Sequence, residues 1–178
     1  QQDRSLTLIL GIDPGSRKTG FGIINQVGGK TEYVTSGVIR VHKEPNMPAR
    51  LDLIFSSLVG IITEYGPHCM AIEEIFMGRG PDSALKLGQA RGVAMVAGTQ
   101  SKLEIFEYAA RKVKQAVVGN GNADKDQVAY MVQSILKLPG LPQEDAADAL
   151  AVALCHNYVH TGLINIAGAT RTRRGRIV

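Results

Sequence analysis

The chain has little cysteine and no long hydrophobic run. Cys69 and Cys155 lie far apart in the sequence, and neither has a partner at the spacing of a metal site, so we expect two reduced core thiols and no zinc. No stretch approaches the roughly 18 apolar residues of a membrane-crossing helix, and the first residues lack the charged and apolar regions of a signal peptide. These absences favour a cytoplasmic protein without a membrane partner.

Acidic residues are absent after Asp148, and the positive charge of the chain is concentrated beyond that point. Without four arginines near the C-terminus, the chain has 16 basic and 16 acidic residues, so the net charge of +4 lies on Arg171, Arg173, Arg174 and Arg176. Polar, basic segments of this kind commonly contact phosphate, although many are simply solvated.

Length and composition indicate one domain. A chain of 178 residues can bury one hydrophobic core but is too short for two ordinary domains, and it contains no internal repeat and no interdomain linker. We expect a folded domain over residues 6–162, preceded by a short N-terminal extension, 1–5, and followed by a basic, irregular tail, 163–178.

The pattern of apolar residues and chain breakers predicts an α/β fold. Three strands in an antiparallel meander come first, beginning near Leu6, Thr19 and Tyr33. A helix capped by Asn46 follows and stops at Gly66. The remaining elements are a buried strand at 69–75, a helix from an Asp82 cap to about residue 100, a strand at 103–108, and helical segments at 111–118, 122–138 and 144–160. This order predicts a mixed sheet with helices on both faces.

Four acids occur where such elements normally carry apolar or small residues: Asp13, Glu73, Asp145 and Asp148. The last two share a helix face, roughly 5–6 Å apart, and the alanines around them allow that face to approach a sheet closely. Crowded carboxylates raise one another's pKa unless a cation neutralises them. Oxygen ligands select a hard ion such as Mg²⁺ or Mn²⁺, and two such ions can cleave a phosphodiester.

Simpler roles exist for three of the four acids. Asp13 precedes Pro14-Gly15 and can anchor a turn, whereas Asp145 and Asp148 can stabilise the N-terminus of a helix. Glu73, within a buried strand, has neither role. Spacing alone therefore suggests a metal site without proving one.

Five motifs together resemble the RuvC family of bacterial Holliday junction resolvases. Their order and spacing match over about residues 8–160. The motifs are LGIDPGSR at 10–17, AIEEIF at 71–76, DSALKLGQARG at 82–92, VKQAVVG at 113–119 and DAADAL at 145–150.

The resemblance implies a ribonuclease H-like fold that acts as a homodimer. Each subunit would nick one of two like-polarity strands of a four-way DNA junction, leaving 5′-phosphate and 3′-hydroxyl ends, beside a RuvA–RuvB branch-migration complex in recombination and repair. It also implies two Mg²⁺ ions per subunit, replaceable by Mn²⁺, held by Asp13, Glu73, Asp145 and Asp148. Our hypothesis is that Asp13 bridges the ions, Glu73 and Asp148 flank it, and Asp145 completes the set or positions water.

Other matched positions imply contacts with DNA. Phe76 corresponds to an aromatic residue that stacks on an unpaired base, and Lys114 and Lys125 to catalytic lysines near the scissile phosphate. As a core phenylalanine and surface lysines, these residues would need no such explanation. Together with neighbouring cations they predict a basic face that holds phosphates, and the expected contacts are Phe76, Arg79, Lys86, Arg91, Lys112, Lys114 and Lys125.

Two features depart from the family pattern. Glu74 adds a second acid after Glu73, and since strand neighbours point to opposite faces, only one can reach the metals; the motif selects Glu73. The loop at 77–81 is also rich in glycine and proline, which bears on the reach of Arg79. A small-residue stripe, Ala90, Ala94 and Gly98, can serve either as a dimer surface or as packing against the protein's own sheet.

Two other functions compete with a resolvase. A junction-binding module would bind the same DNA without cutting it. An actin-like phosphotransferase also begins with a strand and an acidic, glycine-containing turn that cradles phosphate, but such enzymes close two domains around ATP, whereas one is expected here.

Overall fold

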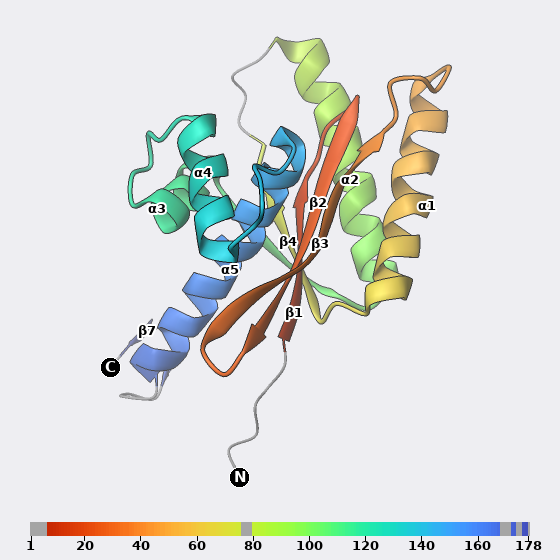
Figure 1. Cartoon of the computed structure of the whole chain (residues 1–178). Helices are drawn as coiled ribbons and strands as arrows, with labels where there is room; N and C mark the ends of the chain where they lie inside the picture. Colours follow the sequence, from red (N-terminus) through yellow and green to blue (C-terminus); the bar gives the residue numbers. More distant parts are fainter. Residues whose placement is uncertain (1–6, 76–79, 168–171, 174–175, 178) are drawn as a thin grey trace.

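A computed structural model describes residues 7–75, 80–167, 172–173 and 176–177 (Figure 1). One five-stranded sheet has the order β3-β2-β1-β4-β5. Strands β1, β2 and β3 form an antiparallel meander, and β4 and β5 run parallel to β1. The elements are β1 (Thr7–Asp13), β2 (Lys18–Val27), β3 (Lys30–Arg40), α1 (Met47–Tyr65), β4 (Cys69–Glu73), α2 (Pro81–Gln100), β5 (Glu104–Tyr108), α3 (Ala110–Val118), α4 (Lys125–Leu136), α5 (Glu144–Ala167), β6 (Thr172–Arg173) and β7 (Arg176–Ile177).

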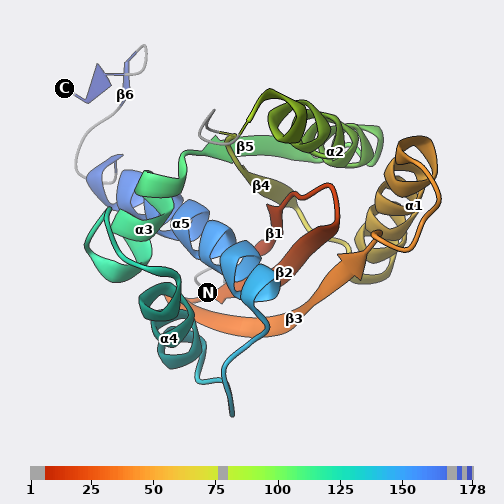
Figure 2. The same ribbon diagram turned by 90° about the horizontal axis from the view of Figure 1, so that it is seen from above.

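Helices cover both faces of the sheet, which confirms the expected α/β architecture (Figure 2). Alternate residues of a strand point to opposite faces, and each face has its own core. Leu10 and Ile12 pack with α1 and α2, whereas Ile9 packs with α3, α4 and α5. The central strands are therefore buried on both sides.

Glycines in β1 and β2 let α5 lie very close to the sheet. A Cβ at Gly11 would stand 2.1 Å from the carbonyl oxygen of Ala149, and one at Gly20 would stand 1.9 Å from the carbonyl oxygen of Asp145. The alanines of α5 that we expected to permit this approach, including Ala146 and Ala149, are buried. The first turns of α5 therefore rest directly on the strands that carry the first acidic motif.

Helix ends follow local signals, with small differences from the expected bounds. Asn46 caps α1 by accepting from Ala49 N, and Gly66 ends the helix in the left-handed conformation. The N-cap of α2 is Gly80, not Asp82, which lies in the first turn. Helix α5 continues past residue 162 to Ala167, and β6 pairs with β7 within the tail that we expected to be irregular.

The small-residue stripe of α2 packs inside the subunit. Ala90, Ala94 and Gly98 are buried, and a Cβ at Gly98 would meet the side chains of Ile105 and Met70. Of the two roles expected for the stripe, the structure selects packing against its own sheet. Within the described residues, no helix is long and apolar enough to span a membrane.

Candidate active site

Asp13 and Glu73 come together because they end neighbouring parallel strands. Ile12 pairs with Ile72 in the register of β1 and β4, so the next residues of both strands emerge side by side at the carboxyl edge of the sheet. The Asp13 side chain lies close enough to Glu73 to act on its pKa, which it lowers. Glu74 is exposed, whereas Glu73 is half-buried, in agreement with the choice of Glu73 as the inward-facing acid.

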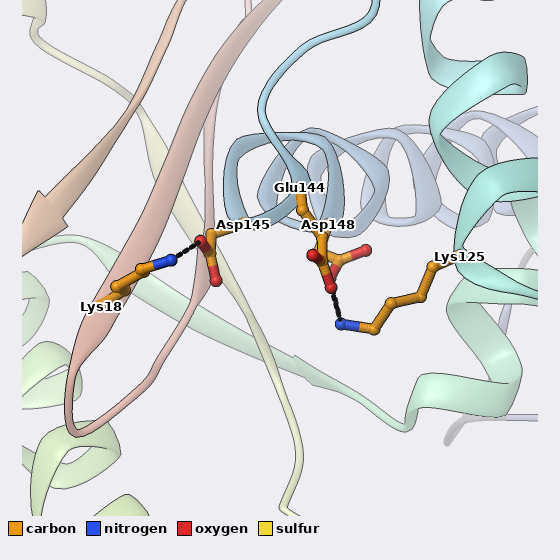
Figure 3. Close-up of polar contacts among 5 residues, drawn as sticks. All are labelled: Lys18, Lys125, Glu144, Asp145 and Asp148. Carbon is orange, nitrogen blue, oxygen red and sulfur yellow. Dashed lines mark hydrogen bonds and ion pairs between the residues drawn. The ribbon is translucent and has the colours of Figure 1, made fainter.

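Asp145 and Asp148 approach the same edge from the first turns of α5. Asp145 Oδ2 lies 4.0 Å from Lys18 Nζ, and Asp148 Oδ2 lies 3.6 Å from Lys125 Nζ. Figure 3 shows that the two lysines reach the two aspartates from opposite sides, Lys18 from β2 and Lys125 from α4. Lys125 also pairs with Glu144.

The acids are crowded enough to disturb one another's protonation. Burial raises the pKa of Asp13 from 3.8 to about 8, with further contributions from the charges of Glu73, Asp148 and Asp145. Burial, followed by the charge of Asp148, raises the pKa of Glu73. Burial also raises the pKa of Asp148 even though Lys125 opposes the change. A site that penalises negative charge in this way favours binding of cations.

Lys125 is placed by the start of α4. Asp124 and Gln127 form a capping box, in which the Asp124 side chain accepts from Gln127 N and the Gln127 side chain accepts from Asp124 N. This fixes Lys125 as the first residue of the helix. Its hydrogen bond to Glu144 raises the pKa of Lys125, so the ammonium stays charged at neutral pH.

All four acids line one cavity of about 960 Å³ at the carboxyl edge of the sheet. Lys114 of α3 and Lys125 line it as well, and the charge of Lys114 acts to lower the pKa of Glu73. The structure therefore brings together six of the residues selected from the sequence: Asp13, Glu73, Lys114, Lys125, Asp145 and Asp148.

Three of the expected DNA contacts lie outside this cavity. Lys86 pairs with Asp82 on the surface of α2, and Lys112 is exposed on α3. Arg91 points inward: its Nε donates to the carbonyl oxygen of Glu73 over 3.0 Å, and its guanidinium forms an ion pair with Glu107. Its contact with DNA stays a prediction, as do those of Lys86 and Lys112. The predictions for Phe76 and Arg79 lie outside the described residues.

The cavity includes basic residues that sequence reasoning did not select. Arg17 and Lys18 lie at the β1–β2 turn, and His42 follows β3. The sequence places Arg17 and Lys18 at the end of the first acidic motif and His42 much later, and none of these positions reveals the direction in which the turn folds.

The donors at this site suit a hard cation. Carboxylate oxygens favour Mg²⁺ over zinc, which prefers nitrogen and sulfur. Within the described part of the chain, no three His, Cys, Asp or Glu side chains are gathered around a common point at metal-ligand distances. Instead, the two helical aspartates face lysines, Asp145 toward Lys18 and Asp148 toward Lys125.

Comparisons with known proteins show the family to which this chain belongs. A family model described as crossover junction endodeoxyribonuclease RuvC matches residues 9–156. The chain is 56% identical over 173 residues to the protein of that name from Saccharophagus degradans, covering 97% of this chain and 100% of the relative. The RuvC of Photobacterium profundum is 58% identical over 172 residues, covering 96% and 99%. Thermus thermophilus RuvC in complex with a Holliday junction substrate superposes with a TM-score of 0.81 at 33% identity, covering 88% and 96%.

Proposed function

Because this chain belongs to the RuvC family of crossover junction endodeoxyribonucleases, we propose that it resolves four-way DNA junctions in recombination and repair by paired, symmetric nicks. One observation carries the proposal: carboxylates from β1, β4 and α5 converge on one cavity, and lysines from separate elements stand beside them. A structural ion-pair network would not need an open cavity of this size. A strand-cutting site needs both access for the backbone and concentrated charge.

We infer that Asp13, Glu73, Asp145 and Asp148 hold Mg²⁺, two ions per subunit, with Mn²⁺ as a substitute. When bound, Mg²⁺ neutralises charge on the scissile phosphate and lowers the pKa of an attacking water. The protein's contribution is placement. Asp13 and Glu73 are fixed by strand register, and the helical pair is fixed by the glycine contacts under α5.

Lys114 and Lys125 are proposed to stabilise the charge that develops on the phosphate as its bond to the leaving oxygen breaks. A fixed cation in a partly desolvated site is worth far more than the same cation in water. Lys125 is held in place by Asp148 and Glu144. Cleavage of the bond to the 3′ oxygen leaves the 5′-phosphate and 3′-hydroxyl ends that a ligase can seal.

Paired nicks on two strands require two sites related by symmetry, so we propose a homodimer. With the small-residue stripe buried, the outer face of α2 is available for the contact: Leu85 is 70% exposed and Val96 is 48% exposed. We further propose, from family membership, action beside RuvA–RuvB in the bacterial cytoplasm, where the chromosome lies.

The test is cleavage of a synthetic four-way junction labelled on each strand in turn. With Mg²⁺ we expect symmetric nicks in two opposing strands, and ligation of the products should restore full-length strands. With EDTA no product should form. Asp13→Asn should shift the junction in a gel without cutting it, whereas Asp52→Asn, on the exposed face of α1, should cut normally. A gel shift without products from the unaltered protein would favour the binding-module alternative.

A further inference from the structure

One wall of the cavity is basic and has no role in the mechanism described above. Arg17 and the first residue of β2, Lys18, are exposed at the β1–β2 turn, and the half-buried His42 stands next to them on the lining. These three residues form what we call the turn wall. It lines the same cavity as the four carboxylates and as Lys114 and Lys125, which come from α3 and α4.

The backbone of the turn wall is held rigidly. Thr19 is fully buried, and its hydroxyl donates to Gly15 O over 3.1 Å and accepts from Gly15 N at 3.3 Å. Val41 N donates to the carbonyl oxygen of Arg17 over 3.0 Å, which ties the turn to the end of β3. The cations therefore project from a fixed base, and little backbone entropy is lost when they bind a ligand.

The turn wall and Lys125 flank the aspartates from opposite sides. Lys18 reaches Asp145 and Lys125 reaches Asp148, and Figure 3 shows the two ammonium groups pointing toward the pair from either side. A DNA strand crossing the carboxylates carries phosphates both before and after the scissile one. Those phosphates need cations on both sides, because the carboxylates between them repel the strand.

We propose that Arg17 and Lys18 bind backbone phosphates of the cut strand on the side of the scissile phosphate opposite to Lys125. The strand then spans the cavity between two cationic walls, with the acids beneath its centre. This inference rests on the proposed function and adds the direction in which the strand crosses the site. His42 lines the same cavity and is not part of the proposed phosphate contact.

The intramolecular contacts of the turn wall are too weak to be its purpose. The Lys18–Asp145 separation of 4.0 Å joins side chains that are 47% and 28% exposed, and solvent screens an ion pair of this kind so that it adds little to stability. Among the described residues, no ion pair involves Arg17. Arg17→Ala therefore tests the contact without disturbing an acid of the site.

The first measurement is junction affinity in EDTA as a function of salt, by fluorescence anisotropy. For Arg17→Ala and Lys18→Ala we expect weaker binding and a slope of log K against log salt that is shallower by about 0.7–0.9 for each lost phosphate contact. Lys18→Arg should restore the slope. Lys30→Ala is the matched control, because Lys30 is an exposed lysine at the β2–β3 turn, outside the cavity, and its slope should equal that of the unaltered protein.

The second measurement locates the contact. Single methylphosphonates, which remove the charge of one phosphate, are placed in turn on either side of the scissile position. One methylphosphonate should weaken junction binding by the unaltered protein but cause no further loss of affinity in Arg17→Ala. A different methylphosphonate should behave in the same way with Lys125→Ala, and the two positions should lie on opposite sides of the scissile phosphate. The inference would be overturned if every methylphosphonate lowered the affinity of Arg17→Ala as much as that of the unaltered protein. It would also be overturned if the position linked to Arg17 lay on the same side of the scissile phosphate as the position linked to Lys125.

These outcomes are separable from those that test the proposed function. If the unaltered protein cuts junctions with Mg²⁺ but the turn-wall variants keep their salt slopes, the strand path is wrong and the resolvase function stands. If the protein does not cut, the proposed function fails, whereas the binding measurements in EDTA still report on the turn wall.

Discussion

Replacing Asp13 with asparagine should stabilise the metal-free protein at alkaline pH even though it abolishes cleavage. The substitution preserves the size of the side chain and removes its charge. In the folded protein, burial and the charges of Glu73, Asp148 and Asp145 raise the pKa of Asp13 from 3.8 to about 8. The folded state therefore resists ionisation of a carboxyl group that ionises freely in the unfolded chain.

The sign of the pH dependence follows from linkage. Below pH ~4 the Asp13 carboxyl is protonated in both states and does not favour either. Between pH ~4 and ~8 the unfolded chain releases the proton while the folded protein keeps it, so stability falls as pH rises. At ~1.36 kcal/mol per pH unit, the full loss above pH ~8 has a ceiling of about 6 kcal/mol. Because part of this shift comes from the charges of Glu73 and Asp148, which titrate themselves, we expect about 3 kcal/mol.

The assay is urea unfolding in EDTA at pH ~5.5 and ~9. The unaltered protein should lose about 2 kcal/mol more than Asp13→Asn between these values, because the part of the loss below pH ~5.5 has already occurred, and added Mg²⁺ should recover stability in the unaltered protein but much less in the variant. Asp52→Asn, at an exposed position of α1, should follow the unaltered protein. Parallel pH profiles for all three proteins would refute the reasoning, because they would show that the charge of Asp13 carries no penalty in the folded state.

Three other substitutions probe how the site is positioned. Gly20→Ala would place a Cβ 1.9 Å from the carbonyl oxygen of Asp145, so α5 must shift; we expect a lower melting temperature and cleavage reduced at least about tenfold, which corresponds to ~1.4 kcal/mol. Arg91→Lys loses the Nε bond to the Glu73 carbonyl, so we expect a higher Mg²⁺ requirement and lower kcat, measured by cleavage at varied Mg²⁺, with junction affinity unchanged. Leu85→Glu, on the exposed face of α2, should shift sedimentation from dimer to monomer.

Each of these has a control within the chain. Gly60→Ala meets open space on α1 and should not lower the melting temperature. Glu107→Gln removes the ion pair of Arg91 but leaves the hydrogen bond from Arg91 Nε to the Glu73 carbonyl oxygen at the end of β4. A loss of junction affinity in Arg91→Lys would instead support the prediction that Arg91 contacts DNA. Leu141→Glu, at an exposed position away from α2, should keep the dimer, and an unchanged sedimentation of the α2 variant would exclude that face.

The amino-acid sequence by itself determined the elements and the acidic pairs. Asp13 and Glu73 end apolar strands, and strands of that kind run parallel with their carboxyl ends at one edge. Asp145 and Asp148 share a helix face through their spacing alone. Caps such as Asn46 and Gly66 are local contacts between near neighbours. Each of these features rests on a periodicity or on a short-range interaction. For that reason the positions of the four acids in the sequence and the family motifs pointed to the same residues.

Only the tertiary structure decided which cations serve the site. Lys112 and Lys114 are near neighbours on one helix, yet only Lys114 lines the cavity. Arg91 is predicted to contact DNA, and only the structure shows that its side chain turns inward to the end of β4. Nothing in the sequence pointed to Lys18, which stands opposite Lys125 although the two lie more than a hundred residues apart in the chain. A long cationic side chain has no periodicity of its own, and its partner is set by where distant turns and helices pack.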